Sequence, residues 1–224
     1  MINLNLKNIS LKFPIIKQKK KIKDINDNSA LKISTGLKDI NLDFKQGDRI
    51  GLIGENGSGK TTLLKTIAGI YEPDNGKIEI NGEMLAVFTL NAGMEDEFTG
   101  YQNIIYQMFL RGYNKEFALS KIDEITKFTR LGNNIHRQVR TYSSGMRARL
   151  AIAIVFSLKA EIFLCDEFIT TSDPSYFDEM IDSIFEKYSK GILIIASHYV
   201  DFIEKRMNRI IELKNGEVIK DIRK

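Results

Sequence analysis

The segment 54–61 constrains the fold of this chain more than any other part of the sequence. It reads Gly-Glu-Asn-Gly-Ser-Gly-Lys-Thr and matches the phosphate-loop pattern G-x-x-x-x-G-K-T at every fixed position. An apolar run at 48–53 precedes it and predicts a strand, and a helical pattern at 62–68 follows it. Glycines in such a loop let backbone N–H groups point at phosphate oxygens, and the helix start adds its positive end. The segment therefore predicts a strand–loop–helix unit that binds phosphate.

The ligand expected at this loop is a nucleoside triphosphate with Mg²⁺. Lys60 should reach the β- and γ-phosphates, and the Thr61 hydroxyl should ligate the metal. The alternative is a glycine-rich turn that matches the pattern by chance, which the order of strand, loop and helix disfavours. The residues expected to contact the nucleotide here are Gly54, Glu55, Asn56, Gly57, Ser58, Gly59, Lys60, Thr61 and Thr62.

Length and composition fit one globular α/β domain. The chain has 224 residues and a net charge of +4, which is too modest to argue for nucleic acid. Its single cysteine, Cys165, has no internal disulfide partner and suits a reducing cytosol. Apolar runs such as 150–156 are far shorter than a membrane span, and the start of the chain lacks a signal-peptide pattern. We therefore expect a soluble or peripheral protein in the cytoplasm.

The order of predicted elements indicates a mainly parallel sheet with an antiparallel portion near the N-terminus. Alternating patterns predict strands at 3–13 and 37–44, and two more within 76–90 that Asn81 and Gly82 should join as a hairpin. The segment 100–158 has a mostly helical pattern. Strands alternating with helices are then expected at 161–165, 191–196 and 208–213, before a last strand at 217–220.

Two further strands should deliver polar side chains to the same edge of the sheet. Asp166 and Glu167 follow the apolar run 161–165, and His198 follows the run 192–196. Ligands of open α/β sheets gather at the carboxyl ends of strands, so Asp166 is placed to hold Mg²⁺ and Glu167 to polarise the attacking water. His198 should touch the γ-phosphate or that water. The alternatives are a solvated acidic turn and a surface histidine, and we assign the other histidine, His136, to the surface.

A second anion-binding segment is expected about twenty residues before Asp166. Ser143, Ser144 and Gly145 stand at the start of a long apolar helix, where hydroxyls, free N–H groups and the helix dipole point outward. The alternative is an ordinary helix N-cap. The residues 142–146, Tyr-Ser-Ser-Gly-Met, are called the signature segment below.

With this spacing the chain resembles the ATPases of ATP-binding-cassette (ABC) transporters from end to end. The signature segment occupies the place of the family's L-S-G-G-Q motif. The form Y-S-S-G-M-R resembles more narrowly the subunits that export O-antigen, capsule and teichoic acid, as do the segments 37–40, 68–73 and 98–104. The resemblance implies a P-loop NTPase (RecA-like) core with an N-terminal antiparallel β portion and an inserted α-helical subdomain at roughly 95–158, within a single ABC ATPase domain spanning 1–224.

The resemblance also implies an ATPase that works as a head-to-tail homodimer. Each ATP would lie between the phosphate loop of one subunit and the signature segment of the other, where Ser143, Ser144 and Gly145 contact it. Lys60, Glu167 and His198 would be catalytic, with Glu167 as the base, and Asp166 and Thr61 would ligate Mg²⁺. Asp173 would act across the dimer interface, and Phe13 would stack on adenine unless it is simply a buried strand residue.

Two positions depart from the family pattern. Ser144 replaces a glycine, so its side chain narrows the approach to the phosphate. The family's Q-loop glutamine is missing, and Leu90 and Asn91 stand at its place; Asn91 keeps an amide that is one methylene shorter, so it either replaces that Mg²⁺ ligand or the ligand is lost. The segment 88–98 should still receive a membrane subunit.

The expected partners are two copies of an integral membrane permease and a lipid-linked glycan, with no nucleic acid, at the cytoplasmic face of the inner membrane. Five lysines, Lys17, Lys19, Lys20, Lys21 and Lys23, either meet anionic headgroups or form a solvated loop. No additional C-terminal glycan-binding domain is expected. The alternative functions are an ABC ATPase driving another cargo and a soluble ABC ATPase acting on nucleic acid or ribosomes, for which this chain lacks a second cassette or an inserted arm.

Overall fold

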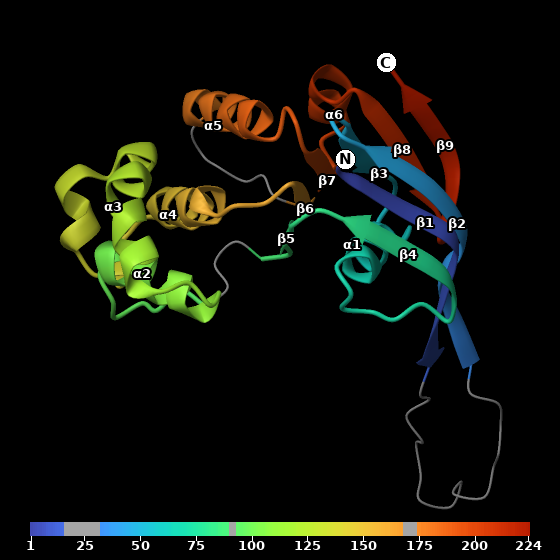
Figure 1. Ribbon diagram of the computed structural model, residues 1–224, viewed down its shortest axis with the longest axis horizontal. Helices are drawn as coiled ribbons and strands as arrows, with labels where there is room; N and C mark the ends of the chain where they lie inside the picture. The colour runs from blue at the N-terminus through green and yellow to red at the C-terminus, as the bar shows by residue number, and fades with distance from the viewer. Residues whose placement is uncertain (16–31, 90–92, 168–173) are drawn as a thin grey trace, which may run out of the picture. The chain divides into compact units, whose positions relative to one another are not determined.

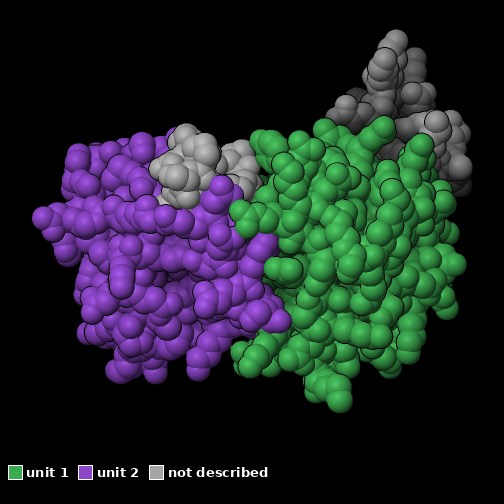
Figure 2. Space-filling model, turned by 90° about the horizontal axis from the view of Figure 1, so that it is seen from above, with its two compact units in different colours: residues 1–86, 161–167, 190–224 green, residues 87–160, 168–189 purple. Residues whose placement is uncertain are grey.

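The computed structural model describes residues 1–15, 32–89, 93–167 and 174–224. The chain divides into two compact units, which are coloured separately in Figure 2. Unit 1 comprises residues 1–86, 161–167 and 190–224, and unit 2 comprises residues 87–160 and 168–189. Each unit is described by itself.

An antiparallel sheet of three strands forms one part of unit 1 (Figure 1). Its strands are β1 (Asn3–Ile15), β2 (Lys32–Lys45) and β4 (Asn75–Asn81), in the order β2-β1-β4. The pairs Leu4↔Phe44 and Leu6↔Leu42 lie opposite one another, and all four side chains are buried. This burial explains the alternating apolar pattern of β1 and β2, since only one face of a strand in such a sheet faces the core.

The second sheet of unit 1 has six strands in the order β5-β6-β7-β3-β8-β9. The four central strands run parallel: β6 (Ile162–Asp166), β7 (Ile192–Ala196), β3 (Arg49–Ile53) and β8 (Arg209–Lys214). β9 (Glu217–Arg223) pairs antiparallel with β8. Every residue of β7 is buried, which is typical of a parallel strand covered on both faces.

Two helices of unit 1 follow strands of this sheet. α1 (Lys60–Ile67) follows β3 and α6 (Val200–Arg206) follows β7. α6 packs closely on the sheet at Gly51, where a Cβ atom would lie only 2.2 Å from Cγ2 of Ile203. The glycine in β3 is therefore required by this close approach.

The predicted hairpin at Asn81 and Gly82 is wrong. β4 ends at Asn81 and β5 (Met84–Val87) follows, but the two strands belong to different sheets. β4 pairs along its length with β1, and β5 lies next to β6. The long-range partner β1 takes the ladder hydrogen bonds of β4, so the local turn signal does not produce a hairpin.

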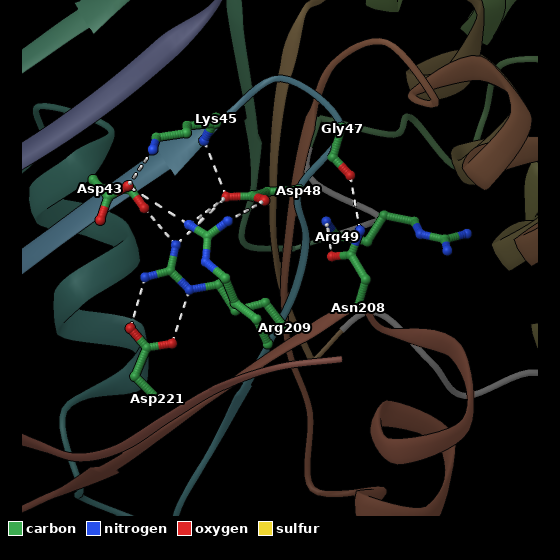
Figure 3. Close-up of polar contacts among 9 residues, drawn as sticks. Asp43, Lys45, Gly47, Asp48, Arg49, Asn208, Arg209 and Asp221 are labelled. Atoms are coloured by element: carbon green, nitrogen blue, oxygen red, sulfur yellow. Dashed lines mark hydrogen bonds and ion pairs between the residues drawn. The ribbon is translucent and has the colours of Figure 1, made fainter.

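A charged network, drawn in Figure 3, lies at the amino-terminal ends of β3 and β8. The Arg209 side chain is 3% exposed and binds both carboxylate oxygens of Asp221, at 2.8 and 2.6 Å. The same guanidinium donates to the Asp43 carbonyl oxygen and lies 3.4 Å from Asp48. Arg209, in β8, therefore ties together β2, β9 and the turn that precedes β3.

Unit 2 is helical. It contains α2 (Gly100–Leu110), α3 (Lys115–Thr129), α4 (Ser144–Ser157) and α5 (Pro174–Lys187), with 3₁₀ turns at Gly132–His136 and Val139–Thr141. Side-chain caps begin three of these helices: a capping box at Thr99 for α2, Asn114 for α3 and Ser143 for α4. Across the described ranges, no helix combines the length and apolar character needed to cross a membrane.

Candidate functional site

The phosphate loop connects β3 to α1 at the carboxyl end of β3. Its glycines Gly54, Gly57 and Gly59 all have positive φ angles, of 142°, 78° and 111°. At Gly54 a Cβ atom would lie 2.3 Å from the Leu213 carbonyl oxygen, so both the backbone angle and the space require glycine. The surroundings of Gly57 are open within 4 Å, which leaves its side of the loop accessible to a ligand.

Lys60 is the first residue of α1 and is only 6% exposed. Its Nζ donates to the carbonyl oxygens of Gly54, at 2.7 Å, and Glu55, at 3.1 Å. Burial lowers the pKa of Lys60, although the nearby Glu167 and Asp166 act in the opposite direction. The ammonium group is thus folded back into the loop, in position to reach a phosphate placed over the same backbone.

Two buried oxygen atoms beside Lys60 have no hydrogen-bond partner among the described residues. They are Oγ of Ser58 and Oδ1 of Asp166. Buried polar atoms are nearly always paired, so unpaired ones at a loop that fits phosphate indicate a ligand site. The free carboxylate oxygen of Asp166 suits a phosphate-bound Mg²⁺, which takes few protein ligands, and the free hydroxyl of Ser58 can donate to a phosphate oxygen. The described residues contain no cluster of three or more metal-ligating His, Cys, Asp or Glu side chains, so phosphate and water would complete the shell.

Glu167 and His198 meet at the carboxyl ends of the adjacent strands β6 and β7. Oε1 of Glu167 lies 2.6 Å from Nε2 of His198. Glu167 has a φ angle of 47°, a left-handed conformation that is costly for a residue with a side chain. Its N–H donates to the Ala196 carbonyl oxygen at 3.0 Å, which ties the strained residue to the end of β7. The structure thus brings Lys60, Asp166, Glu167 and His198 together within unit 1.

Phe13 also belongs to unit 1, where it is partly exposed in β1. Its ring lies edge-to-face with that of Tyr71, with ring centroids 5.4 Å apart. Phe13 is not one of the fully buried core residues, which disfavours the alternative that it merely fills the core.

The signature segment lies in unit 2, at the start of α4. Ser143 is the N-cap, and its hydroxyl accepts from the Met146 N–H at 3.2 Å. Ser143 and Ser144 are exposed and Gly145 is partly exposed, so the first turn of α4 is open to a ligand. Both interpretations of this segment, the cap and the anion site, are compatible with this geometry.

A strap of residues, 95–99, binds the residues on either side of the signature segment. The Asp96 carboxylate lies 2.5 Å from Nη1 of Arg147, in the first turn of α4. The Asp96 carbonyl oxygen accepts from Arg140 N–H, and the Phe98 carbonyl oxygen from Val139 N–H, both at 2.9 Å. These bonds link the segment expected to receive a membrane subunit with the segment expected to contact nucleotide.

Three predicted features fall outside the described residues. They are Asn91, Asp173 and the lysines between Lys17 and Lys23. Sequence reasoning missed the Phe13–Tyr71 pair and the Asp96–Arg147 pair. For the first pair the sequence offers only the family resemblance of the segment 68–73, which contains Tyr71. For the second pair the signal is the acidic run 95–97 together with the basic residues that flank the signature segment.

Comparison with known proteins places the chain in a family. Residues 37–170 match the model described as "ABC transporter". The O-antigen export system ATP-binding protein RfbE of Yersinia enterocolitica is 37% identical over 99% of this chain and 98% of its own. The teichoic acids export ATP-binding protein TagH of Staphylococcus haemolyticus is 31% identical over 97% of this chain and 83% of its own.

Solved structures show the same fold. The cassette MJ0796, in a structure titled as a dimeric post-hydrolysis state bound to ADP and phosphate, superposes with a TM-score of 0.77 over 98% of both chains at 20% identity. A nucleotide-free ATP-binding cassette from an ABC transporter gives 0.74 over 100% of this chain and 92% of its own at 19% identity. The predicted fold class is therefore confirmed, and the chain belongs to the ABC transporter family as one of its ATP-binding and ATP-hydrolysing cassettes.

Proposed function

We propose that this chain is the ATPase subunit of an exporter that moves a lipid-linked polysaccharide out of the cytoplasm. The observation that supports the cargo is the near full-length similarity to O-antigen and teichoic acid export ATP-binding proteins. The observation that supports the chemistry is the grouping of Lys60, Asp166, Glu167 and His198 around a phosphate loop in unit 1.

Each side chain of this group has a separate task in hydrolysis. Backbone N–H groups of the loop and the Lys60 ammonium hold the triphosphate, and Thr61, Thr62, Glu55, Asn56 and Ser58 line its path. Thr61 and Asp166 would hold Mg²⁺, and the bound ion would supply positive charge that offsets the charge of the phosphates. Glu167 accepts a proton from the attacking water, and His198 orients the Glu167 carboxylate through the contact at 2.6 Å. Phe13 stacks on adenine.

The active form is a head-to-tail homodimer. Ser143, Ser144 and Gly145 of one subunit bind the γ-phosphate held by the loop of the other, with the positive end of α4 directed at it. Asp173 and Asn91 complete the site as interface and metal residues. The open first turn of α4 supports this arrangement, because a phosphate can take the place of solvent there without breaking the Ser143 cap.

The subunit works from the cytoplasmic face of the membrane on two copies of a permease. The exposed apolar side chains Phe98, Phe109 and Leu110 of unit 2 support a protein partner at this part of the chain, since exposed apolar groups favour contact surfaces. The strap 95–99 then connects that contact to the signature segment. The cassette acts as a single ABC ATPase domain, with the helical part of unit 2 as its inserted subdomain.

The experiment that tests the cargo uses cells in which Glu167→Gln replaces the native subunit. Lipid-linked glycans are extracted and compared with the wild type by mass spectrometry, and surface glycan is measured in parallel. We expect a long glycan to accumulate on its lipid carrier and to disappear from the surface. Cells with Glu161→Gln, which alters a carboxylate at the other end of β6, serve as the matched control and should export normally.

An unchanged glycan profile would contradict polysaccharide export. ATP hydrolysis by the purified wild-type subunit, measured alongside, separates this result from a failure of the ATPase assignment. Hydrolysis with an unchanged profile would leave a cassette that drives another cargo.

A further inference from the structure

Phe13 and Tyr71 form an aromatic pair that is not needed to fill the core. The rings are inclined by 76° with centroids 5.4 Å apart, an edge-to-face arrangement. Phe13 comes from β1, and Tyr71 follows the C-terminal end of α1. Both side chains are partly exposed, so the pair keeps ring surface that a ligand can cover.

Gly36 connects this pair with the phosphate loop. A Cβ atom on Gly36 would lie 2.6 Å from Cε2 of Phe13, so the Phe13 ring rests directly against the Gly36 backbone. The Gly36 carbonyl oxygen in turn lies 3.1 Å from the place of a Cβ atom on Gly59, the residue that precedes Lys60. Gly36 therefore lies against both the Phe13 ring and the loop, so a nucleotide whose phosphates the loop holds can place its base near this ring.

Tyr71 is fixed to the helix that carries the phosphate-binding lysine. Its N–H donates to the Lys65 carbonyl oxygen at 3.3 Å, and the Lys65 ammonium lies 5.7 Å from the centre of its ring. α1 thus presents Lys60 at its beginning and holds Tyr71 at its end. Because the Phe13 ring packs against Tyr71, the fixed position of Tyr71 also restricts the position of the Phe13 ring.

We propose that Tyr71 is a positioning residue for the nucleobase: it holds the Phe13 ring in the orientation that stacks on the purine. The inference rests on the proposed binding of ATP and adds a determinant of base recognition to it. A ring already held by a neighbouring ring loses less conformational freedom when it stacks, so it binds a flat purine more tightly. The pair contributes to binding of the base and leaves binding of the phosphates to the loop.

The test compares ATP with inorganic tripolyphosphate, which has the phosphates but no base. Dissociation constants for both are measured by calorimetry in the presence of Mg²⁺. Tyr71→Leu should weaken ATP binding about threefold to tenfold, the range expected from loss of one aromatic contact, and should leave tripolyphosphate binding unchanged. Tyr71→Phe should bind both as the wild type does, because it keeps the ring that packs against Phe13.

Two further variants make the test specific. Gly36→Ala places a methyl group against the Phe13 ring and should cause the same loss for ATP alone. Tyr101→Leu removes a ring that stacks on His136 in unit 2 and should change neither ligand. In a Phe13→Leu background, Tyr71→Leu should have no additional effect, since Tyr71 acts through Phe13.

Equal weakening of ATP and tripolyphosphate by Tyr71→Leu would overturn the proposal, because it would show a general effect on the fold. Unchanged binding of ATP would overturn it as well. If Lys60→Ala still binds both ligands like the wild type, the nucleotide site itself is wrongly assigned, so the two failures are distinguishable.

Discussion

Oε1 of Glu167 lies 2.6 Å from Nε2 of His198, across the ends of two adjacent parallel strands. The two side chains are exposed to 59% and 42%, so water competes for both groups and the contact adds little to stability. Glu167 nevertheless adopts a left-handed backbone φ angle of 47°. A strained residue held in a weak contact indicates a functional rather than a stabilising arrangement.

Glu167→Gln should lower kcat for ATP hydrolysis by about 10²–10⁴, because an amide cannot accept the proton of the attacking water. The affinity for ATP should stay close to the wild type. His198→Ala should also lower kcat, and the double variant should be no worse than the poorer single one, since both residues act as a unit. Steady-state kinetics and equilibrium binding measure these effects. Normal turnover in Glu167→Gln would assign the base to another residue.

Lys60→Ala should abolish ATP binding while the protein stays folded. The ammonium group is desolvated and its pKa is lowered, so its removal takes away a buried charge as well as two hydrogen bonds to loop carbonyls. Calorimetry measures the affinity and thermal unfolding measures the stability. Lys205→Ala, which changes an exposed lysine on α6, is the control and should bind ATP normally. Unchanged affinity in Lys60→Ala would contradict the phosphate-loop assignment.

Ser143→Ala separates the capping role of this serine from its proposed role at the nucleotide. Loss of the bond to the Met146 N–H should reduce the free energy of unfolding by about 1 kcal/mol. Asn114→Ala removes the corresponding cap of α3, where the side chain accepts from Phe117 N–H, and should cost a similar amount. Only Ser143→Ala should impair ATP hydrolysis. Equal rates of ATP hydrolysis in the two variants would show that Ser143 only caps α4.

The parts of the site that could be predicted are those that a short run of the sequence defines by itself. The phosphate loop, the strand that ends at Asp166 and Glu167 and the strand before His198 are each defined within about ten residues, and the parallel order of β6, β7 and β3 brings their ends together. The fold class followed from the same alternation of strands and helices. Predicting that the phosphate loop, Asp166, Glu167 and His198 lie together needs only one further rule, that ligands bind at the carboxyl edge of such a sheet.

The features that sequence did not predict depend on distant partners. Phe13 and Tyr71 meet because Gly36 leaves room for a ring, which no local pattern shows. The hairpin predicted at Asn81 does not form, because β4 pairs with β1 instead of β5. In each case a contact across many residues decides the outcome, so tertiary context overrides the local preference.

Arg209→Met should lower the free energy of unfolding by about 3–5 kcal/mol, because it leaves carboxylate groups without their buried partner. We expect a loss near the lower end of this range, because Arg223 still contacts Asp48 in the variant. Arg130→Met removes an exposed ion pair with Glu179 in unit 2 and should cost less than about 1 kcal/mol. Urea unfolding measures both. Similar losses in the two variants would show that the Arg209 network of Figure 3 is not a special support of unit 1.

The network also predicts a pH dependence. The hydrogen bonds from Arg209 hold the pKa of Asp221 below its ordinary value. A carboxyl group with a lowered pKa stabilises the fold above its unfolded-state pKa of about 3.9 and loses that contribution as pH falls through the folded-state value. Asp221→Asn should therefore be less stable than the wild type at pH 7, and the difference should narrow below about pH 4. A difference that stays constant with pH would exclude the charge of Asp221 as its cause.

A mixture of two inactive variants tests the head-to-tail dimer directly. Lys60→Ala has a defective phosphate loop and an intact signature segment, and Ser143→Ala has the reverse. In a mixed dimer, one of the two sites combines the intact loop of the Ser143→Ala subunit with the intact signature segment of the Lys60→Ala subunit. ATP hydrolysis should therefore rise well above that of either variant alone when they are mixed and should depend on their ratio. A mixture as inactive as its components, in a preparation whose dimers are seen by light scattering, would show that Ser143 does not act on the nucleotide of the opposite subunit.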